Sequence, residues 1–461
     1  MTDLDTIFKA YDVRGVYPDE LDEGLARRIG AAFVRFTGFD RVVLGRDMRL
    51  SSPPLAAAFA AGASAAGAAI VDVGEVSTDA LYFASGKLDL PGAMFTASHN
   101  PGRYNGIKLC RAKAAPIGEE SGLLEIKELA RAEGQPDVRA PTEPVPEDNV
   151  AIEHMDVLGD YARHCRSMID VTKLKPLKVA IDAGNGMAGK TVPLVFGDLN
   201  MDVVPLFFEL DGAFPNHPAN PIEPENLVDL QRAVVENGCD LGIAFDGDAD
   251  RMFLVDEHTE LVSGSLTTAL VADRLLDKHP GETIIYNLIC SWTVPEVIRE
   301  KGGVPVRSRV GHSFIKEVMA DTGAIFGGEH SGHYYFRDNF RADSGMIAAL
   351  IVLEAMSEAG LPLSELLQPF RRYSDSGEIN SEVHDQQASI EKLAATFSDG
   401  RQDRLDGLTV EFDDWWFNCR PSNTEPLLRL NLEARTPSLK DEKVREVLRV
   451  IRGPETNGED V

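Results

Sequence analysis

Strand-like and helix-like segments alternate along most of this chain, and polar loops follow the strand-like segments. Short apolar runs predict strands, and the longer periodic segments between them predict helices. Repeated strand–loop–helix units favour α/β sheets. We expect strands at 41–46, 69–73, 92–96, 177–182, 203–208, 241–245, 283–288, 304–308 and 324–327, and helices at 54–67, 227–237, 294–301 and 313–321.

The C-terminal quarter has a different pattern. From about residue 370, alternating strands at 408–412 and 427–432 precede a last helix near 439–449, which predicts a smaller α+β domain. Residues 134–150 are rich in Pro, Glu and Asp without a period and are typical of a linker or surface loop. At the start of the helix 54–67, Ser51 and Ser52 are candidate caps.

Charge and cysteine content exclude several classes of protein. The 461 residues carry a formal net charge of -28, which disfavours nucleic acid and anionic membrane surfaces as partners. Five scattered cysteines without a CxxC pair argue against a disulfide framework or a zinc site. The N-terminal segment lacks an apolar signal core, and the apolar stretch 55–70 is too short to span a bilayer. We therefore expect a cytoplasmic protein.

A serine lies on a tight loop after the expected strand 92–96. The sequence is TASHNPG from Thr96, with NGIK following at 105–108, so Ser98 is placed as an exposed nucleophile. His99 and Lys108 are nearby candidates to supply positive charge or to relay a proton. A generic Ser-His-Asn loop is more often an ordinary turn with a capping serine, but the longer match makes the nucleophile the better interpretation.

Three aspartates with a two-residue spacing follow the expected strand 241–245. In DGDADR, Asp246, Asp248 and Asp250 can turn their carboxylates towards one point, which suits Mg²⁺. A calcium loop of the helix–loop–helix type would need a longer ligand spacing and a closing Glu. Arg251 is placed to bind a phosphoryl group beside the metal. A solvated acidic turn is the weaker alternative.

Two later loops carry groups suited to a sugar phosphate. GEHSGH at 328–333 offers Glu329 and Ser331 for bidentate hydrogen bonds to sugar hydroxyls, and it lacks the helical context of a zinc-binding His pair. RPSNTEP at 420–426 offers an arginine, hydroxyls and turn N–H groups as a cradle for a monophosphate, although a plain surface turn is equally compatible. YDVRG at 11–15 and GHS at 311–313 are weaker candidates of the same kind.

These loops, in this order, resemble the α-D-phosphohexomutases, and within them the phosphomannomutase/phosphoglucomutase branch. The resemblance extends from residue 11 to residue 426. It implies three similar α/β domains with mixed sheets and a C-terminal α+β domain like the TATA-binding-protein module, around a central cleft. The implied domains are a phosphoserine domain at 1–152, a metal-binding domain at 153–254, a sugar-recognition domain at 255–368 and a phosphate-binding domain at 369–461.

The resemblance also implies a reaction. Ser98 matches the serine that carries the phosphoryl group between O1 and O6 of a hexose phosphate, mannose first and glucose also, through a hexose 1,6-bisphosphate. The implied Mg²⁺ ligands are Ser98, Asp246, Asp248 and Asp250. The implied catalytic helpers are His99, Lys108, Arg251, Arg14 and His312.

The implied partner is a hexose monophosphate, and the sequence leaves the oligomeric state, monomer or dimer, open. Family members often carry a lysine where this chain has Ile289, so we expect that contact either to be lost or to be supplied by Arg307 or Arg309. The alternatives are a phosphoglucosamine mutase, a non-catalytic sugar-phosphate-binding protein and a phosphatase. The implied substrate-binding residues are Tyr11, Glu329, Ser331, Arg420, Ser422, Asn423 and Thr424.

Overall fold

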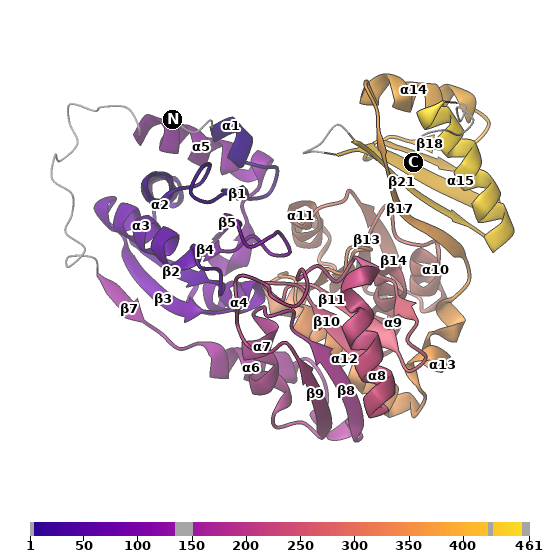
Figure 1. Ribbon diagram of the computed structural model, residues 1–461, viewed down its shortest axis with the longest axis horizontal. Helices are drawn as coiled ribbons and strands as arrows, with labels where there is room; N and C mark the ends of the chain where they lie inside the picture. Colours follow the sequence, from indigo (N-terminus) through magenta and orange to yellow (C-terminus); the bar gives the residue numbers. More distant parts are fainter. Residues whose placement is uncertain (1–3, 134–150, 423–426, 454–461) are drawn as a thin grey trace.

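Four β-sheets succeed one another along the chain (Figure 1). The computed structural model describes residues 4–133, 151–422 and 427–453. The expected linker at 134–150 therefore lies outside the described residues, as do Asn423 and Thr424.

The first sheet is mixed. Its strand order is β1-β5-β4-β2-β3-β7, with β6 beside β5, and β5 runs antiparallel to its neighbours whereas β2, β3, β4 and β7 are parallel. The elements of this part are β1 (Val13–Val16), β2 (Arg41–Arg46), β3 (Ala69–Glu75), β4 (Gly92–Phe95), β5 (Tyr104–Arg111), β6 (Ala115–Pro116), β7 (Ile152–His154), α1 (Leu4–Ile7), α2 (Glu23–Thr37), α3 (Ser52–Ala65), α4 (Thr78–Leu88) and α5 (Leu123–Glu133).

The second and third sheets have a related plan in which parallel central strands carry an antiparallel edge. The orders are β12-β11-β10-β8-β9 and β14-β13-β15-β16. The second sheet has β8 (Leu177–Asp182), β9 (Met201–Leu206), β10 (Leu241–Phe245), β11 (Met252–Asp256), β12 (Leu261–Val262), α6 (Leu158–Ser167), α7 (Ala188–Phe196) and α8 (Val228–Asn237). The third has β13 (Thr283–Asn287), β14 (Val304–Ser308), β15 (Phe326–Gly328), β16 (Tyr334–Phe336), α9 (Gly264–Lys278), α10 (Thr293–Glu300), α11 (His312–Thr322) and α12 (Gly345–Ala359).

The fourth sheet is antiparallel throughout, in the order β17-β21-β20-β19-β18. This confirms the expected change from α/β to α+β architecture. Its elements are β17 (Ser374–Glu382), β18 (Arg401–Asp403), β19 (Leu408–Glu411), β20 (Trp415–Pro421), β21 (Leu427–Ala434), α14 (Gln386–Thr396) and α15 (Pro437–Arg452). The short helix α13 (Leu363–Leu367) precedes them and packs into the core of the preceding sheets.

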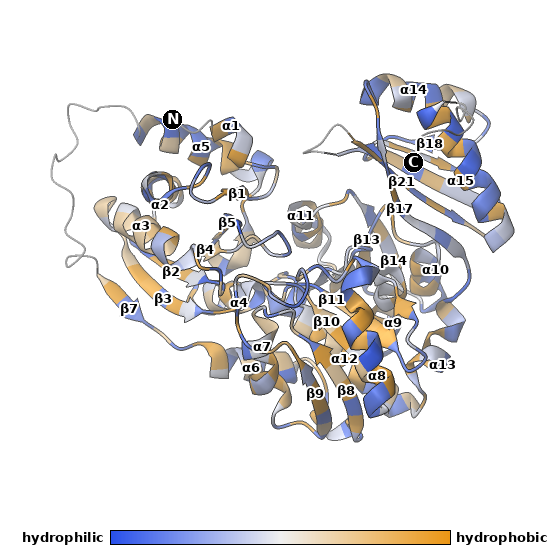
Figure 2. Cartoon of the chain, in the orientation of Figure 1, coloured by the Kyte–Doolittle hydropathy of each residue, from blue (hydrophilic) through white to orange (hydrophobic). Residues whose placement is uncertain are grey.

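One hydrophobic cluster spans the first three sheets, each of which also has a further cluster of its own, whereas the fourth sheet shares none of them. Val43 of β2, Ile243 of β10 and Ile284 of β13 belong to a single cluster of buried side chains, which α12 crosses. The core of the fourth sheet forms a separate cluster around Phe417. Figure 2 shows hydrophobic residues along strands such as β2 and β3 and mainly hydrophilic residues on α15. The fourth sheet is thus the more independent unit.

Three details bear on the sequence-based expectations. The expected boundary after residue 152 falls within β7, which pairs with β3 of the first sheet. Ser51 occupies the N-cap of α3, but its side chain makes no capping hydrogen bond, so the expected cap is wrong. Among the described residues no single helix is long and apolar enough to cross a membrane; only the bent pair Gly345–Ala359 and Leu363–Phe370 passes when joined.

Candidate active site

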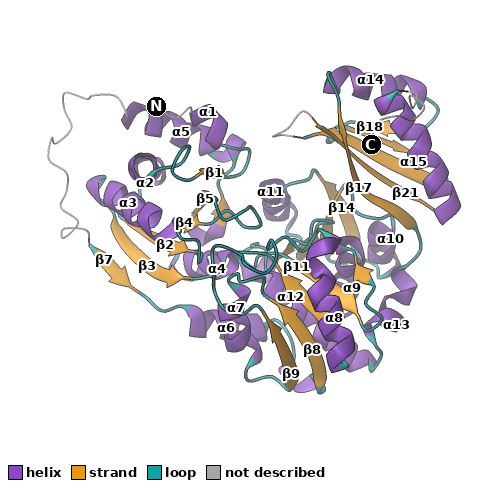
Figure 3. Ribbon diagram, in the orientation of Figure 1, coloured by secondary structure: helices purple, strands orange, loops and turns teal. Residues whose placement is uncertain are grey.

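Loops that follow strands of the first two sheets run together near the centre of the molecule (Figure 3). Ser98 lies three residues beyond the end of β4 and has a φ of 49°, a left-handed conformation that is uncommon outside glycine. Its backbone N–H donates to Thr96 Oγ1 at 2.9 Å, and its buried hydroxyl donates to Asp246 Oδ2 at 2.5 Å. Backbone strain of this kind gathers at functional sites.

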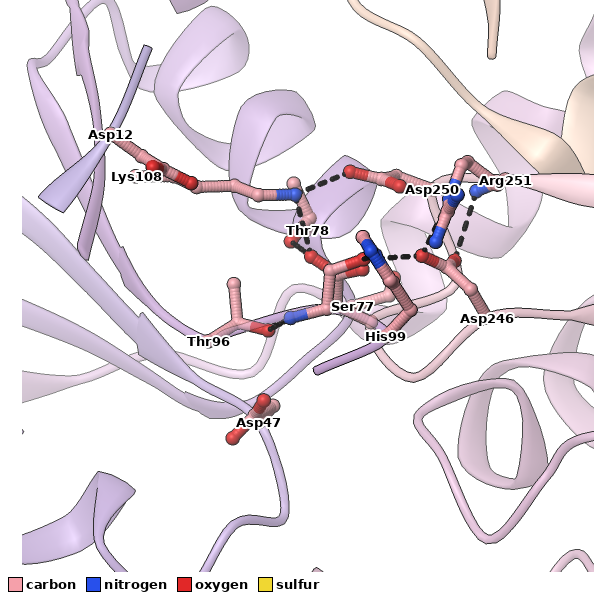
Figure 4. A network of polar contacts seen from close by, with 12 residues as sticks. Asp12, Asp47, Ser77, Thr78, Thr96, His99, Lys108, Asp246, Asp250 and Arg251 are labelled. Carbon is pink, nitrogen blue, oxygen red and sulfur yellow. Dashed lines mark hydrogen bonds and ion pairs between the residues drawn. The ribbon is translucent and has the colours of Figure 1, made fainter. Parts of the chain in front are cut away.

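The three aspartates follow β10 and are buried. Figure 4 shows Asp250 facing Lys108, and Asp246 beside Arg251. Carboxylate oxygens of Asp246, Asp248 and Asp250 lie within 4.8 Å of one another. Lys108 of β5 reaches them from the first sheet, and its Nζ donates to Asp248 at 2.7 Å and to Asp250 at 2.6 Å. Arg251 donates through Nε to Asp246 Oδ2 at 3.0 Å. Residues 140 or more positions apart therefore meet in one polar cluster.

The charges of this cluster shift one another. Burial opposes the charge on Lys108, but Asp248 and Asp250 hold the pKa of its ammonium well above the usual range. Burial together with Asp248 and Asp246 raises the pKa of Asp250 to about 7. Three buried carboxylates thus face two buried cations, Lys108 and Arg251. The excess of negative charge suits an additional cation.

The donor set fits magnesium. Asp248 Oδ1 and Asp250 Oδ1 are buried and accept no hydrogen bond within the described part of the chain. A buried carboxylate oxygen without a donor is costly unless a cation binds it. Hard oxygen ligands from a few carboxylates are those that Mg²⁺ prefers. The residues that would hold the ion are Asp246, Asp248 and Asp250, with the Ser98 hydroxyl beside Asp246.

Two further residues expected from the sequence, His99 and Arg14, lie beside the serine loop. His99 Nδ1 lies 3.3 Å from Ser98 Oγ, and burial together with Arg251 and Arg14 holds the pKa of His99 well below its usual range. Arg14 of β1 donates to Asn100 Oδ1 at 2.6 Å and forms an ion pair with Asp12. The imidazole is therefore neutral, and the guanidinium lies against the loop that carries the serine.

The third sheet contributes the loop after β15. Glu329 is buried there and accepts hydrogen bonds from Tyr335, from Asn287 Nδ2 at 3.1 Å and from the N–H of Gly311 at 3.3 Å. Ser331 is partly exposed two residues later. The carboxylate is thus held rigidly, while the hydroxyl remains accessible.

The fourth sheet contributes Arg420 near the end of β20. Its Nη2 donates to Glu378 at 2.7 Å, while its Nε is buried without a hydrogen-bond partner among the described residues. The charge of Arg420 acts on the pKa values of Tyr11 and His330, so the side chains of three sheets lie within electrostatic reach of one another. Ser422 is buried beyond it, and its N–H donates to the Leu427 carbonyl at 2.8 Å.

Tyr11 and α11 line a cavity of about 780 Å³ between the N-terminal segment and the third sheet. The Tyr11 hydroxyl donates to the Val310 carbonyl at 3.1 Å, and its ring packs edge-on against Phe314 at 5.9 Å. His312 is the first residue of α11. Burial raises the pKa of Tyr11 to about 12, so it stays a neutral donor.

Comparison with known proteins identifies the family. Models described as phosphoglucomutase/phosphomannomutase alpha/beta/alpha domains I, II and III match residues 5–137, 159–260 and 263–373, and the C-terminal domain model matches 378–450. The chain is 42% identical over 452 residues to "Phosphohexose mutases" of Xanthomonas campestris, covering 97% of this chain and 99% of the relative. The chain belongs to the phosphoglucomutase/phosphomannomutase family.

Other relatives agree. A phosphomannomutase of Escherichia coli is 41% identical over 440 residues, covering 93% of this chain and 95% of the relative. A solved phosphoglucomutase/phosphomannomutase family protein from Burkholderia thailandensis has a TM-score of 0.87 and 34% identity, covering 98% and 99% of the two chains. The protein is thus an isomerase, an intramolecular phosphotransferase of a magnesium-dependent family whose members act on hexose phosphates.

Several contacts of this mutase site had no signal in the sequence. Thr78, at the start of α4, donates through its hydroxyl to Asp248 Oδ2 at 2.6 Å. His333 lies between two carboxylates, with Nδ1 at 3.8 Å from Asp250 and 2.9 Å from Asp343. Desolvation opposes protonation of His333, yet Asp250 and Asp343 raise its pKa. His333 stood in a quoted motif without a role, whereas nothing near Thr78 pointed to a partner 170 residues away.

Ile289 occupies the position where the family resemblance leads us to expect a lysine. Ile289 is buried beside His330 and Trp416, at the junction with the fourth sheet. Arg307 does not point to an open site, because it forms ion pairs with Asp403 and, at 3.1 Å, with Glu411. Of the two expected replacements, only Arg309 is exposed and lines the cavity beside Tyr11.

Proposed function

We propose that this family member moves a phosphoryl group between O1 and O6 of a hexose monophosphate, mannose phosphate first and glucose phosphate also. The reaction passes through a phosphoserine at Ser98 and a hexose 1,6-bisphosphate. The observation that carries this proposal is the hydrogen bond of 2.5 Å from the Ser98 hydroxyl to Asp246, within a cluster of three carboxylates. A nucleophile held there can exchange a phosphoryl group with charge neutralised on both sides.

In the first half-reaction the phosphoryl group leaves phosphorylated Ser98 for a free sugar hydroxyl. The P–O bond to Ser98 breaks, a P–O bond to the sugar oxygen forms, and the proton of the sugar hydroxyl ends on Ser98 Oγ. His99 Nδ1 lies 3.3 Å from that oxygen, which is close enough to relay this proton. The bisphosphate then turns end for end, and the other phosphoryl group returns to Ser98 by the same steps in reverse.

Charge neutralisation dominates a phosphoryl transfer of this kind, because the transition state forms little new covalent structure. Arg251 and Lys108 are both buried beside the serine and supply fixed positive charge. A magnesium ion on Asp246, Asp248 and Asp250 would supply Lewis-acid stabilisation of the transferring group. Arg14 donates to Asn100 Oδ1 at 2.6 Å and so places a further guanidinium beside the loop that carries Ser98.

Recognition of the sugar phosphate is assigned to the third and fourth sheets. Glu329 and Ser331 would read the sugar hydroxyls, and Arg420 with Ser422 would hold the phosphate that does not react. Binding energy from that remote phosphate can be used to orient the reacting end. Tyr11 and His312 complete the substrate side. Asn423 and Thr424 stay predictions from the sequence, because they lie outside the described residues.

All five cysteines are buried and form no disulfide, which supports the expectation of a reducing, cytoplasmic setting.

The test of the proposed function compares the 1-phosphates of mannose, glucose and glucosamine in coupled assays with Mg²⁺ and a hexose 1,6-bisphosphate. We expect turnover of mannose and glucose phosphates and its loss in Ser98→Ala. Preference for glucosamine phosphate would favour a phosphoglucosamine mutase, and release of inorganic phosphate without isomerisation would favour a phosphatase. Binding without turnover would indicate a non-catalytic protein.

A further inference from the structure

Arg49 is completely buried against the backbone of the loop that carries Ser98. All five N–H groups of its guanidinium have an acceptor, which is the full capacity of an arginine fork. Nε donates to Asp47 Oδ2 at 3.1 Å. Nη1 and Nη2 donate to four backbone carbonyls, three in the serine loop and one at the first residue of β5: those of Ser98 at 2.7 Å, Asn100 at 2.7 Å, Pro101 at 2.9 Å and Tyr104 at 2.9 Å.

A loop of the second sheet closes the other side of this arginine. The Phe214 ring lies over the guanidinium, with its centroid 5.1 Å from Cζ. The chains pack so tightly that a Cβ at Gly212 would lie 2.6 Å from Arg49 Cα, and one at Gly247 would lie 2.4 Å from the Ser98 carbonyl oxygen. The Arg49 guanidinium is therefore enclosed between the loop that carries Ser98 and the second-sheet loops that contain Gly212 and Gly247.

We propose that Arg49 is a positioning residue for phosphoryl transfer, which fixes the Ser98 hydroxyl at the aspartate cluster by binding the four carbonyls around it. This inference rests on the proposed role of Ser98. The serine holds an unfavourable φ of 49°, so the surrounding contacts must determine that conformation. Arg49 binds the carbonyl of this same residue at 2.7 Å, while the hydroxyl of that residue donates to Asp246.

A lysine cannot take over this role. Its ammonium has three donors and no planar fork, so at least one buried carbonyl would lose its partner. The loop would then relax, and the hydroxyl would shift relative to Asp246. A shift of about 1 Å at the reacting atom lowers the rate of the chemical step about 100-fold and leaves the residues that bind the substrate unchanged. The effect should therefore fall on kcat and not on KM.

The experiment compares Arg49→Lys with Arg166→Lys in the full-length protein. Arg166 is the matched control, because its Nη1 also donates to two carbonyls, at 2.7 and 3.2 Å, but on α7 away from the serine. We expect Arg49→Lys to lower kcat about 100-fold, to slow phosphorylation of Ser98 by glucose 1,6-bisphosphate in parallel, and to leave KM and the Mn²⁺ affinity measured by electron paramagnetic resonance within about twofold. Arg166→Lys should keep kcat within about twofold.

A folded Arg49→Lys with kcat within threefold of the wild type would overturn the assignment, and so would a raised KM with unchanged kcat. If that variant does not fold, Phe214→Leu decides, since Phe214 is only partly buried and covers the same guanidinium. It should lower kcat about two- to fivefold at constant KM, and an unchanged kcat would refute the inference. Ser98→Ala distinguishes failure of the proposed function from failure of the Arg49 assignment. If Ser98→Ala keeps turnover, the proposed function fails. If Ser98→Ala is inactive but the Arg49 variants stay active, only the Arg49 assignment fails.

Discussion

Replacing Lys108 by Met should destabilise the protein in a way that magnesium corrects. The ammonium lies 2.7 Å from Asp248 and 2.6 Å from Asp250, and all three groups are buried. With an effective dielectric constant of about 20, each contact is worth about 6 kcal/mol before desolvation. The net loss on removing one partner of a buried ion pair is about 3–5 kcal/mol, because the remaining charges lose their compensation.

This loss corresponds to a decrease in Tm of roughly 6–20 °C for a unit of about 150–250 residues. The assay is thermal unfolding of Lys108→Met and wild type in EDTA and in MgCl₂. A divalent ion on the same carboxylates replaces the missing charge, so the decrease should be several degrees smaller in MgCl₂. Mutase activity should fall about 100-fold or more in both buffers, because Lys108 also stabilises the transferring group.

The matched control is Lys87→Met, which removes an ion pair with Asp160 on the surface, where the side chains are 45% and 38% exposed. An exposed pair contributes about 0–1 kcal/mol, so its Tm should change little and equally in both buffers. An equal decrease of Tm for Lys108→Met with and without magnesium, or an unchanged Tm in EDTA, would refute the reasoning about the carboxylate cluster.

Three further predictions concern other parts of the site. Glu329→Gln should lower kcat/KM for mannose 1-phosphate about 10-fold or more in steady-state assays, because a buried carboxylate acceptor is lost; an unchanged value would remove Glu329 from recognition. Arg420→Lys should raise KM for the monophosphate about 10-fold while Ser98 phosphorylation remains intact by mass spectrometry, and loss of phosphorylation instead would contradict its remote role. Burial raises the pKa of Asp79 from 3.8 to about 6, so the folded state loses stability as the pH rises from about 4 to about 6 and no more above that. The unfolding free energy of Asp79→Asn relative to wild type, from denaturant titrations, should therefore rise by up to about 3 kcal/mol between pH 4 and pH 6, and a difference that does not change with pH would count against this account.

Strands with apolar, β-branched runs were predictable from the sequence. The segments 41–46, 177–182, 241–245 and 304–308 are strands with the expected bounds, and each contains valine or isoleucine, which favour strands. The cap of α3 was not predictable. Ser51 and Ser52 have the right chemistry, but Asn105 donates to both hydroxyls and Ser52 donates to Asp47. The two hydroxyls therefore form hydrogen bonds with residues outside the helix instead of capping its N-terminus.

The motif residues of the site were predictable because each strand ends at a loop, and such loops gather where sheets meet. Ser98 and Asp246 were placed together by motif resemblance, and their side chains do meet. Arg49 and Thr78 could not be found in this way. The loop that Arg49 binds begins 49 residues away within the first-sheet part of the chain, whereas Thr78 meets Asp248, 170 residues away, through packing of the first sheet against the second.

The central claim is that the phosphoryl group passes through Ser98. The most direct measurement treats the protein with a hexose 1,6-bisphosphate carrying labelled phosphate, maps the label by peptide mass spectrometry, and then adds unlabelled mannose 1-phosphate. The account predicts about one label per chain on the peptide containing Ser98, followed by its transfer to the sugar at least as fast as kcat. An active enzyme that carries no label on Ser98, or a label that stays on the protein during turnover, would contradict it.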